Sequence, residues 1–193
     1  HLAPGGMLSI STWIKNPPRD TVKLLATAIE AMKRHGEKTP DQSIVMIRSW
    51  QTATLLVKNG PFQRKDITAI RDFCKNRRFD ISYCPGIDEK ETNTFNILEE
   101  DFFHQAAISF LSQEKEKFYQ RYPFYVKPAT DDRPFYSHFF KIDMLKEYLG
   151  SSNRAFIPFL DWGYILVFIT ACILFILGMA FILAPISFAL PSR

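Results

Sequence analysis

The chain has 193 residues, with 24 Lys and Arg against 20 Asp and Glu, and 47% of its residues are hydrophobic. An aromatic content of 15% and balanced charges exclude a disordered chain. Because basic and acidic residues are interleaved, we expect no nucleic acid among the partners. The charges are unevenly distributed, however, since residues 162–192 contain no Asp, Glu, Lys, Arg or His. This segregation argues against an ordinary soluble domain.

The first predicted elements are a strand, a helix and a hairpin. Met7–Ser11 is an apolar strand after a Pro-Gly-Gly turn, and apolar residues at helical spacing predict a helix from Val22 to Met32 that ends near Gly36. Residues 43–48 and 53–58 are two β-rich runs. The link between them is too short for a crossover helix, so they should form an antiparallel hairpin.

The second half of the first 150 residues is predicted to contain further helices and one strand. These are a helix over about 64–76, a strand over 79–83, a polar loop over 87–96, a helix over 98–113 with a charged continuation to 121, and a short helix over 144–149.

A group of six basic residues around the helix at 64–76 suggests a phosphate or lipid-headgroup site. Three aspartates interrupt the group, so a solvated helix face is favoured. The basic residues are Arg64, Lys65, Arg71, Lys75, Arg77 and Arg78, and the aspartates are Asp66, Asp72 and Asp80.

The first strand is apolar on both faces and should therefore have a neighbour on each side. Nothing earlier in the chain can supply one, so we expect the chain to be a fragment of a larger domain. Cys74, Cys84 and Cys172 are too few and too scattered for a disulfide framework, and reduced thiols are expected.

The charge-free segment predicts a transmembrane helix over residues 163–184, because this stretch would extend about 33 Å as an α-helix and a hydrocarbon core is about 30 Å thick. The alternative is a buried core helix. By the positive-inside rule, the cations before the segment place residues 1–161 in the cytoplasm. These cations are Lys141, Lys146 and Arg154, and only Arg193 follows the segment.

Few residues are arranged for catalysis. No phosphate-binding loop, zinc motif or nucleophile elbow is present in the sequence, and no metal site is expected. The candidates for catalysis are Asp131 and Asp132: one could orient a cationic substrate while the other pairs with Arg133, and the alternative is a structural turn.

Arg48 and Trp50 are the second pair of candidates, and together with Arg133 they are the candidates for substrate binding. They lie at the hairpin tip, at the carboxyl end of a strand, where open α/β sheets bind ligands. The alternative is a structural contact within the hairpin. His104, on a Phe-rich helix, is expected to be a partly buried histidine with a hydrogen-bond partner.

Three stretches carry a resemblance to known families. Leu2–Ile10 resembles the turn and fifth strand of class I S-adenosylmethionine-dependent methyltransferases, and the hairpin resembles their strands six and seven, with the seventh inserted antiparallel into the sheet. Thr130–Tyr136, followed by an apolar segment, resembles the TDDxPF stretch of bacterial membrane-embedded proteins related to spermidine synthase.

The resemblance implies an α/β fold: the C-terminal half of a Rossmann-like, methyltransferase-type sheet with an antiparallel hairpin, followed by a transmembrane helix. The implied domains are 1–150 (partial α/β domain), 151–162 (linker), 163–184 (membrane span) and 185–193 (start of a loop or further membrane region). The implied location is the bacterial inner membrane, as a multi-pass protein, with the lipid bilayer and other transmembrane helices as partners.

The implied function is a transferase that uses S-adenosylmethionine or its decarboxylated form, spermidine synthase-like or methyltransferase-like. The residues of that family that bind the donor would all precede His1, so no cofactor-binding residue is expected in this chain, which would be inactive by itself. The alternative is a non-catalytic regulatory or scaffold domain of a multi-span membrane protein.

Overall fold

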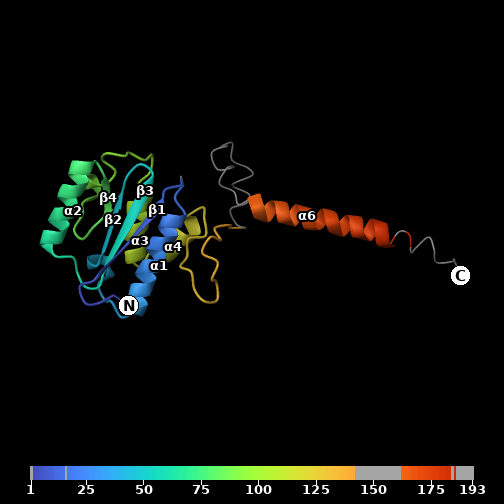
Figure 1. Ribbon diagram of the computed structural model, residues 1–193, viewed down its shortest axis with the longest axis horizontal. Helices are drawn as coiled ribbons and strands as arrows, with labels where there is room; N and C mark the ends of the chain where they lie inside the picture. Colours follow the sequence, from blue (N-terminus) through green and yellow to red (C-terminus); the bar gives the residue numbers. More distant parts are fainter. Residues whose placement is uncertain (1, 16, 142–161, 184, 186–193) are drawn as a thin grey trace. The chain divides into compact units, whose positions relative to one another are not determined.

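The computed structural model describes residues 2–15, 17–141, 162–183 and 185, and the chain divides into two units, His1–Lys141 and Ile142–Arg193. The predicted helix at 144–149 and residues 151–161 of the predicted linker lie outside the described residues. The first unit is a mixed α/β structure (Figure 1). Its helices and strands are β1 (Met7–Trp13), α1 (Asp20–Arg34), η1 (Pro40–Gln42), β2 (Ile44–Arg48), β3 (Thr52–Lys58), α2 (Arg64–Arg77), β4 (Asp80–Tyr83), η2 (Glu89–Glu91), α3 (Phe102–Leu111) and α4 (Lys115–Arg121).

The four strands form one sheet in the order β1-β3-β2-β4, and every neighbouring pair is antiparallel. The predicted hairpin is confirmed: only three residues join β2 to β3, so the chain must reverse at once. The prediction of a Rossmann-like parallel sheet is wrong for the described residues. Strands that run in the same direction are never neighbours, because β3 separates β1 from β2 and β2 separates β3 from β4.

Helices cover both faces of the sheet. Thr12 of β1 bonds Thr21 of α1, with 2.8 Å between their hydroxyl oxygens, so α1 lies over the face on which Thr12 projects. On the opposite face, α2 contributes Cys74 to an apolar cluster with Val45, Ile47 and other residues. Side chains alternate between the faces of a strand, and the register places Ser9 opposite Leu56 on this second face.

Helix α3 begins at Phe102, four residues later than predicted. The Asp101 side chain accepts a hydrogen bond from the backbone N–H of His104, which caps the helix. The Leu98 backbone is bound instead by Asn93: its N–H donates to Asn93 Oδ1 at 2.7 Å and its carbonyl accepts from Asn93 Nδ2 at 2.9 Å. These bonds keep the residues before Phe102 in a loop.

The second unit contains α6 (Trp162–Gly178), followed by a π-helical turn, Met179–Leu183. Among the described residues, no helix is both long enough and apolar enough to span a bilayer. This finding contradicts the predicted membrane span at 163–184 and the predicted multi-pass location in the inner membrane. The physical reason is the change of helix type after Gly178: the 17 residues of α6 extend only about 26 Å as an α-helix.

Candidate functional site

A buried ion pair joins β2 to β4 at one end of the sheet. Arg48, the last residue of β2, and Asp80, the first of β4, are each 1% exposed, and 3.5 Å separates Arg48 Nη1 from Asp80 Oδ2. The Arg48 guanidinium also donates to the carbonyl of Asn96 and to Oδ1 of Asn93, both at 2.5 Å. A sequence-predicted binding residue is therefore enclosed in the protein.

The loop after β4 wraps around the Asp80 carboxylate. The backbone N–H groups of Thr94, Phe95 and Asn96 donate to it at 2.6, 2.8 and 2.8 Å, and the Asn96 side chain adds a bond of 2.9 Å. Burial acts to raise the pKa of Asp80, but the hydrogen bonds from Phe95 and Asn96 and the charge of Arg48 outweigh it, so this pKa lies below its usual value. The carboxylate stays ionised.

The same cluster fixes three surface segments at one end of the sheet. Arg48 is followed directly by the hairpin tip, Asp80 is preceded by the end of α2, and Asn96 belongs to the loop; Asn96 Nδ2 also donates to the Arg78 carbonyl at 3.0 Å. The end of β1 lies there too, because Trp13 is opposite Thr52, the first residue of β3.

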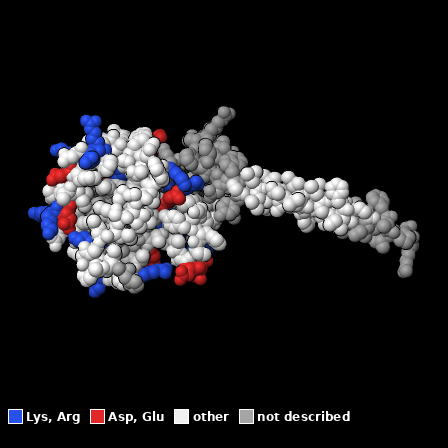
Figure 2. Space-filling view, in the orientation of Figure 1, with Lys and Arg blue, Asp and Glu red and all other residues white. Residues whose placement is uncertain are grey.

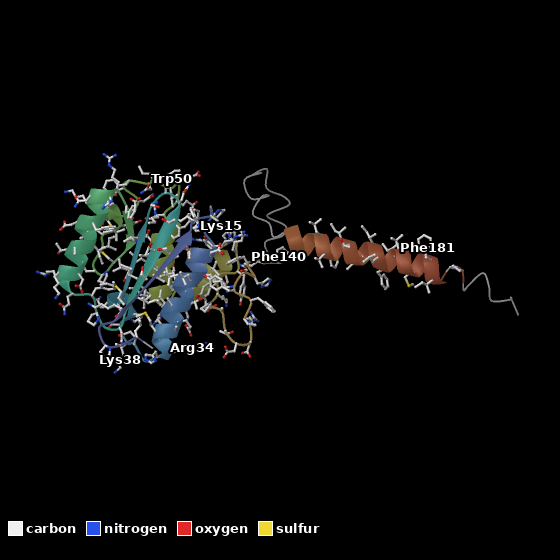
Figure 3. The ribbon with its side chains drawn as sticks, in the orientation of Figure 1. Lys15, Arg34, Lys38, Trp50, Phe140 and Phe181 are labelled. Carbon is white, nitrogen blue, oxygen red and sulfur yellow. The ribbon has the colours of Figure 1, made fainter. Side chains whose placement is uncertain are left out.

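Four large apolar side chains are exposed at this end of the sheet, which we call the aromatic end. Their exposed fractions are 69% for Trp13, 64% for Trp50, 47% for Phe95 and 67% for Ile97. Figure 3 shows Trp50 at the tip of the hairpin, at the upper edge of the view. Since exposed apolar patches mark interaction sites, the predicted residue Trp50 lies in a surface suited to binding.

The predicted catalytic residues Asp131 and Asp132 lie at the tip of a tight turn. Thr130 and Arg133 close it through two backbone hydrogen bonds, of 2.9 and 3.4 Å, and both aspartates are exposed. Arg133 donates to the Tyr125 hydroxyl at 2.8 Å, so the structure pairs it with a tyrosine where an aspartate was expected. The turn does not bring these residues near Arg48 in any contact among the described residues.

A buried lysine holds the segment after this turn. Lys23 of α1 is 1% exposed, and its ammonium donates to the carbonyls of His138 and Phe135 at 3.1 and 3.5 Å. Three aromatic rings, of Tyr125, Tyr136 and Phe139, lie 5.1–5.4 Å from Lys23 Nζ. Burial lowers the pKa of Lys23, and the charge of Asp20 opposes this shift. We call this arrangement the lysine clasp.

A hollow of about 890 Å³ lies beside α3 and α4. His104 lines it, but its Nδ1 is 3.1 Å from the Ser82 carbonyl, as expected for a partly buried histidine with a partner. At the rim, Lys117 donates to Glu114 at 2.6 Å. His104, Glu114 and Lys117 of this hollow are thus engaged in local contacts. In the described residues, no three His, Cys, Asp or Glu side chains are grouped to hold a metal ion.

Sequence reasoning missed the residue at the centre of the cluster. The sequence pattern marks Asp80 only as one of three aspartates that interrupt a group of basic residues, and it marks residues 87–96 only as a polar loop. A usable signal was the pair of asparagines, Asn93 and Asn96, in a segment that must be held without regular structure. Comparison with protein-family models, curated proteins and solved structures found no match to this chain.

Proposed function

We propose that this chain is a non-catalytic interaction domain that presents the aromatic end to a partner. The observation that carries the proposal is the division of roles in the cluster. Arg48 and Asp80, the groups with chemical capacity, are enclosed and bound to each other. The side chains that reach solvent, Trp50 and Phe95 among them, supply contact area and carry no group that transfers protons.

Calorimetric titration of the chain with S-adenosylmethionine and with its decarboxylated form tests this proposal. We expect no heat of binding with either donor, and a Trp50→Ala variant should behave like the parent chain. Saturable heat with either donor would contradict a non-catalytic role, because binding of the donor is the first requirement of a transferase.

A second candidate function is the non-catalytic half of an S-adenosyl-donor-dependent transferase, spermidine synthase-like or methyltransferase-like. Its support is the position of β3, antiparallel between β1 and β2, which the resemblance leads one to expect. The open side of β1 adds support: no described strand pairs with it, and Met7 and Leu8 are 55% and 42% exposed. The donor would then bind to strands that join β1.

This candidate predicts donor binding by the full translation product that contains the chain. Ser9→Pro is the matched test, because the backbone N–H of Ile14 donates to Gln51, so that N–H groups of odd-numbered residues in β1 point away from β3. Ser9→Pro should leave the pairing with β3 intact and abolish donor binding, whereas Thr54→Ser should change neither. Absence of heat with both donors in the full product would exclude this candidate.

A further inference from the structure

We propose that the aromatic end binds single-stranded nucleic acid, with the cations at the end of α2 on the phosphates and the exposed rings against the bases. This inference rests on the proposed interaction role of that surface. The overall charge of the sequence led to the expectation of no nucleic acid among the partners. The inference departs from that expectation because two of the aspartates around α2 are engaged in contacts with other residues.

Two of the three aspartates that interrupt the basic group are withdrawn from it. Asp66 accepts from Lys58 Nζ at 2.7 Å and from the backbone N–H of Gln63, so it is spent at the start of α2. Asp80 is buried against Arg48. Only Asp72 remains exposed on α2 itself. After Asp72, the exposed charged residues up to the cap of α2 are therefore all basic: Lys75, Arg77 and Arg78.

The cations at the end of α2 face solvent. Arg71 pairs with Glu91 from η2. Lys75, Arg77 and Arg78 are exposed, and no acidic partner contacts them within the described part of the chain. Figure 2 shows blue side chains gathered over the upper end of α2. This local excess of positive charge is complementary to a polyanion.

The backbone at the end of α2 contacts the loop that carries Phe95 and Ile97. The Arg78 carbonyl accepts from Asn96 Nδ2 at 3.0 Å, and Asn96 lies in the chain between Phe95 and Ile97. Arg48, which binds the Asn96 carbonyl, leads in two residues to Trp50. The basic residues at the end of α2 and the aromatic residues of the loop and the hairpin tip therefore belong to segments that are attached to the same buried Arg48–Asp80 cluster.

Arg78 occupies a backbone position that favours glycine. It caps the end of α2 with φ 55° and ψ 42°, in the left-handed region. An arginine here is strained relative to glycine, and such strain at a surface position points to a role for the side chain. The residue whose carbonyl accepts from Asn96 is thus an arginine at a position where glycine would be more stable.

Single-stranded nucleic acid fits this surface better than an acidic peptide does. Both bring negative charge, but only the nucleic acid brings flat bases that stack on exposed rings, and stacking with a basic track is the common mode of binding single strands. Arginine adds planar contacts to bases and two-pronged hydrogen bonds to phosphates. A peptide of Asp and Glu would leave Trp50 and Phe95 without a matching surface.

The test is fluorescence anisotropy of a short labelled oligothymidine with the 193-residue chain over a range of salt concentrations. Three phosphate contacts predict a slope of log affinity against log salt of about −2. Arg77→Gln with Arg78→Gln should bring the slope to about −0.7, and Trp50→Ala should weaken binding about tenfold. Lys38 is an exposed lysine that precedes β2 in the sequence. Lys38→Gln removes its charge and should change neither the affinity nor the slope.

Arg78→Gly is the most specific variant. It should weaken binding while the melting temperature stays equal or rises, a combination that general damage to the fold does not produce. No binding at low salt, equal losses in Lys38→Gln and the Arg77/Arg78 double variant, or equal competition by a polyglutamate peptide would each overturn the inference. If the oligothymidine test fails and neither donor gives heat of binding in calorimetry, the nucleic-acid inference is wrong and the non-catalytic role stands. Heat of binding with either donor would contradict the non-catalytic role, whatever the oligothymidine result.

Discussion

Two regions of the first unit bury a cation in different ways. Arg48 is enclosed with a carboxylate, Asp80, which itself accepts hydrogen bonds from three consecutive backbone N–H groups. Lys23 is enclosed by two carbonyls and three aromatic rings in the lysine clasp, and the charge of Asp20 also acts on it. The first arrangement pairs two buried charges directly, and the second surrounds a buried charge mainly with neutral groups.

The two arrangements hold the neighbouring surface segments to different degrees. The Arg48–Asp80 cluster immobilises loop backbone on all sides and so fixes the side chains of the aromatic end. In the lysine clasp, Lys23 of α1 holds residues 135–139 through two hydrogen bonds of 3.1 and 3.5 Å. We therefore expect substitutions in the cluster to disturb stability and binding together, and substitutions in the clasp to have small effects.

The largest effect is expected for Asp80→Asn. The variant leaves the Arg48 charge buried without a counter-charge, which costs about 3–5 kcal/mol in the free energy of unfolding. Urea denaturation followed by circular dichroism measures the loss. Asp72→Asn, at an exposed position of α2, should leave the midpoint unchanged. Equal stability of the two variants would show that the cluster does not anchor the fold.

The pH dependence separates the same two regions. Because the pKa of Asp80 is lowered by folding, its stabilisation is complete above the unfolded value of about 3.9 and is lost as pH falls through the folded pKa. Folding also lowers the pKa of Lys23, so the unfolded state binds more protons and stability rises with pH up to about 10.4. The Asp80 contribution to stability therefore falls on the acid side, and the Lys23 contribution rises on the alkaline side. The raised pKa values of the buried Cys74 and Cys84 thiols act in the opposite direction there, so the Lys23 contribution is measured as the difference between the parent chain and its variant. Asp80→Asn should flatten the first slope and Lys23→Met the second.

Lys23→Met sharpens the comparison at neutral pH. The variant removes a buried charge that is surrounded mainly by neutral groups and keeps the length of the side chain, so its loss of stability should be within about 1 kcal/mol. Arg48→Met, the matched change in the cluster, should cost about 3 kcal/mol, because it leaves Asp80 without its counter-charge. Denaturation curves of the two variants side by side provide the measurement. A larger loss for Lys23→Met than for Arg48→Met would reverse the interpretation of the two regions.

The smallest expected effect is a gain. Arg78→Gly relieves the left-handed backbone position at the end of α2 and should stabilise the protein by about 1 kcal/mol. Differential scanning calorimetry resolves such a shift. Arg77→Gly, one residue earlier in the helix, should instead lower stability, because glycine weakens a helix. A loss in both variants would mean that the Arg78 side chain contributes to the fold.

Local patterns in the sequence predict the elements of the first unit but not their contacts. The short link Ser49–Gln51 alone predicts the antiparallel hairpin, and the spacing of apolar residues predicts α1 and α2. The Asp80 cluster could not be predicted as a set of contacts, because three of its donors are backbone N–H groups, which every residue except proline has, at positions 14–16 residues away. The apolar run after residue 162 establishes only the composition of that segment. The change from an α-helix to a π-helical turn after Gly178 depends on backbone hydrogen bonding, which the composition does not show.

The open side of β1 has a consequence for amide hydrogen exchange. Since the backbone N–H of Ile14 faces β3, those of Leu8, Ile10 and Thr12 face it as well, while those of Ser9 and Ser11 point outward. Deuterium should therefore replace hydrogen in alternate residues of a single strand, quickly at the two serines and slowly between them. The alternation is a signature that vanishes when another strand joins the sheet, so the exchange rates of two serine amides report whether β1 has found a partner.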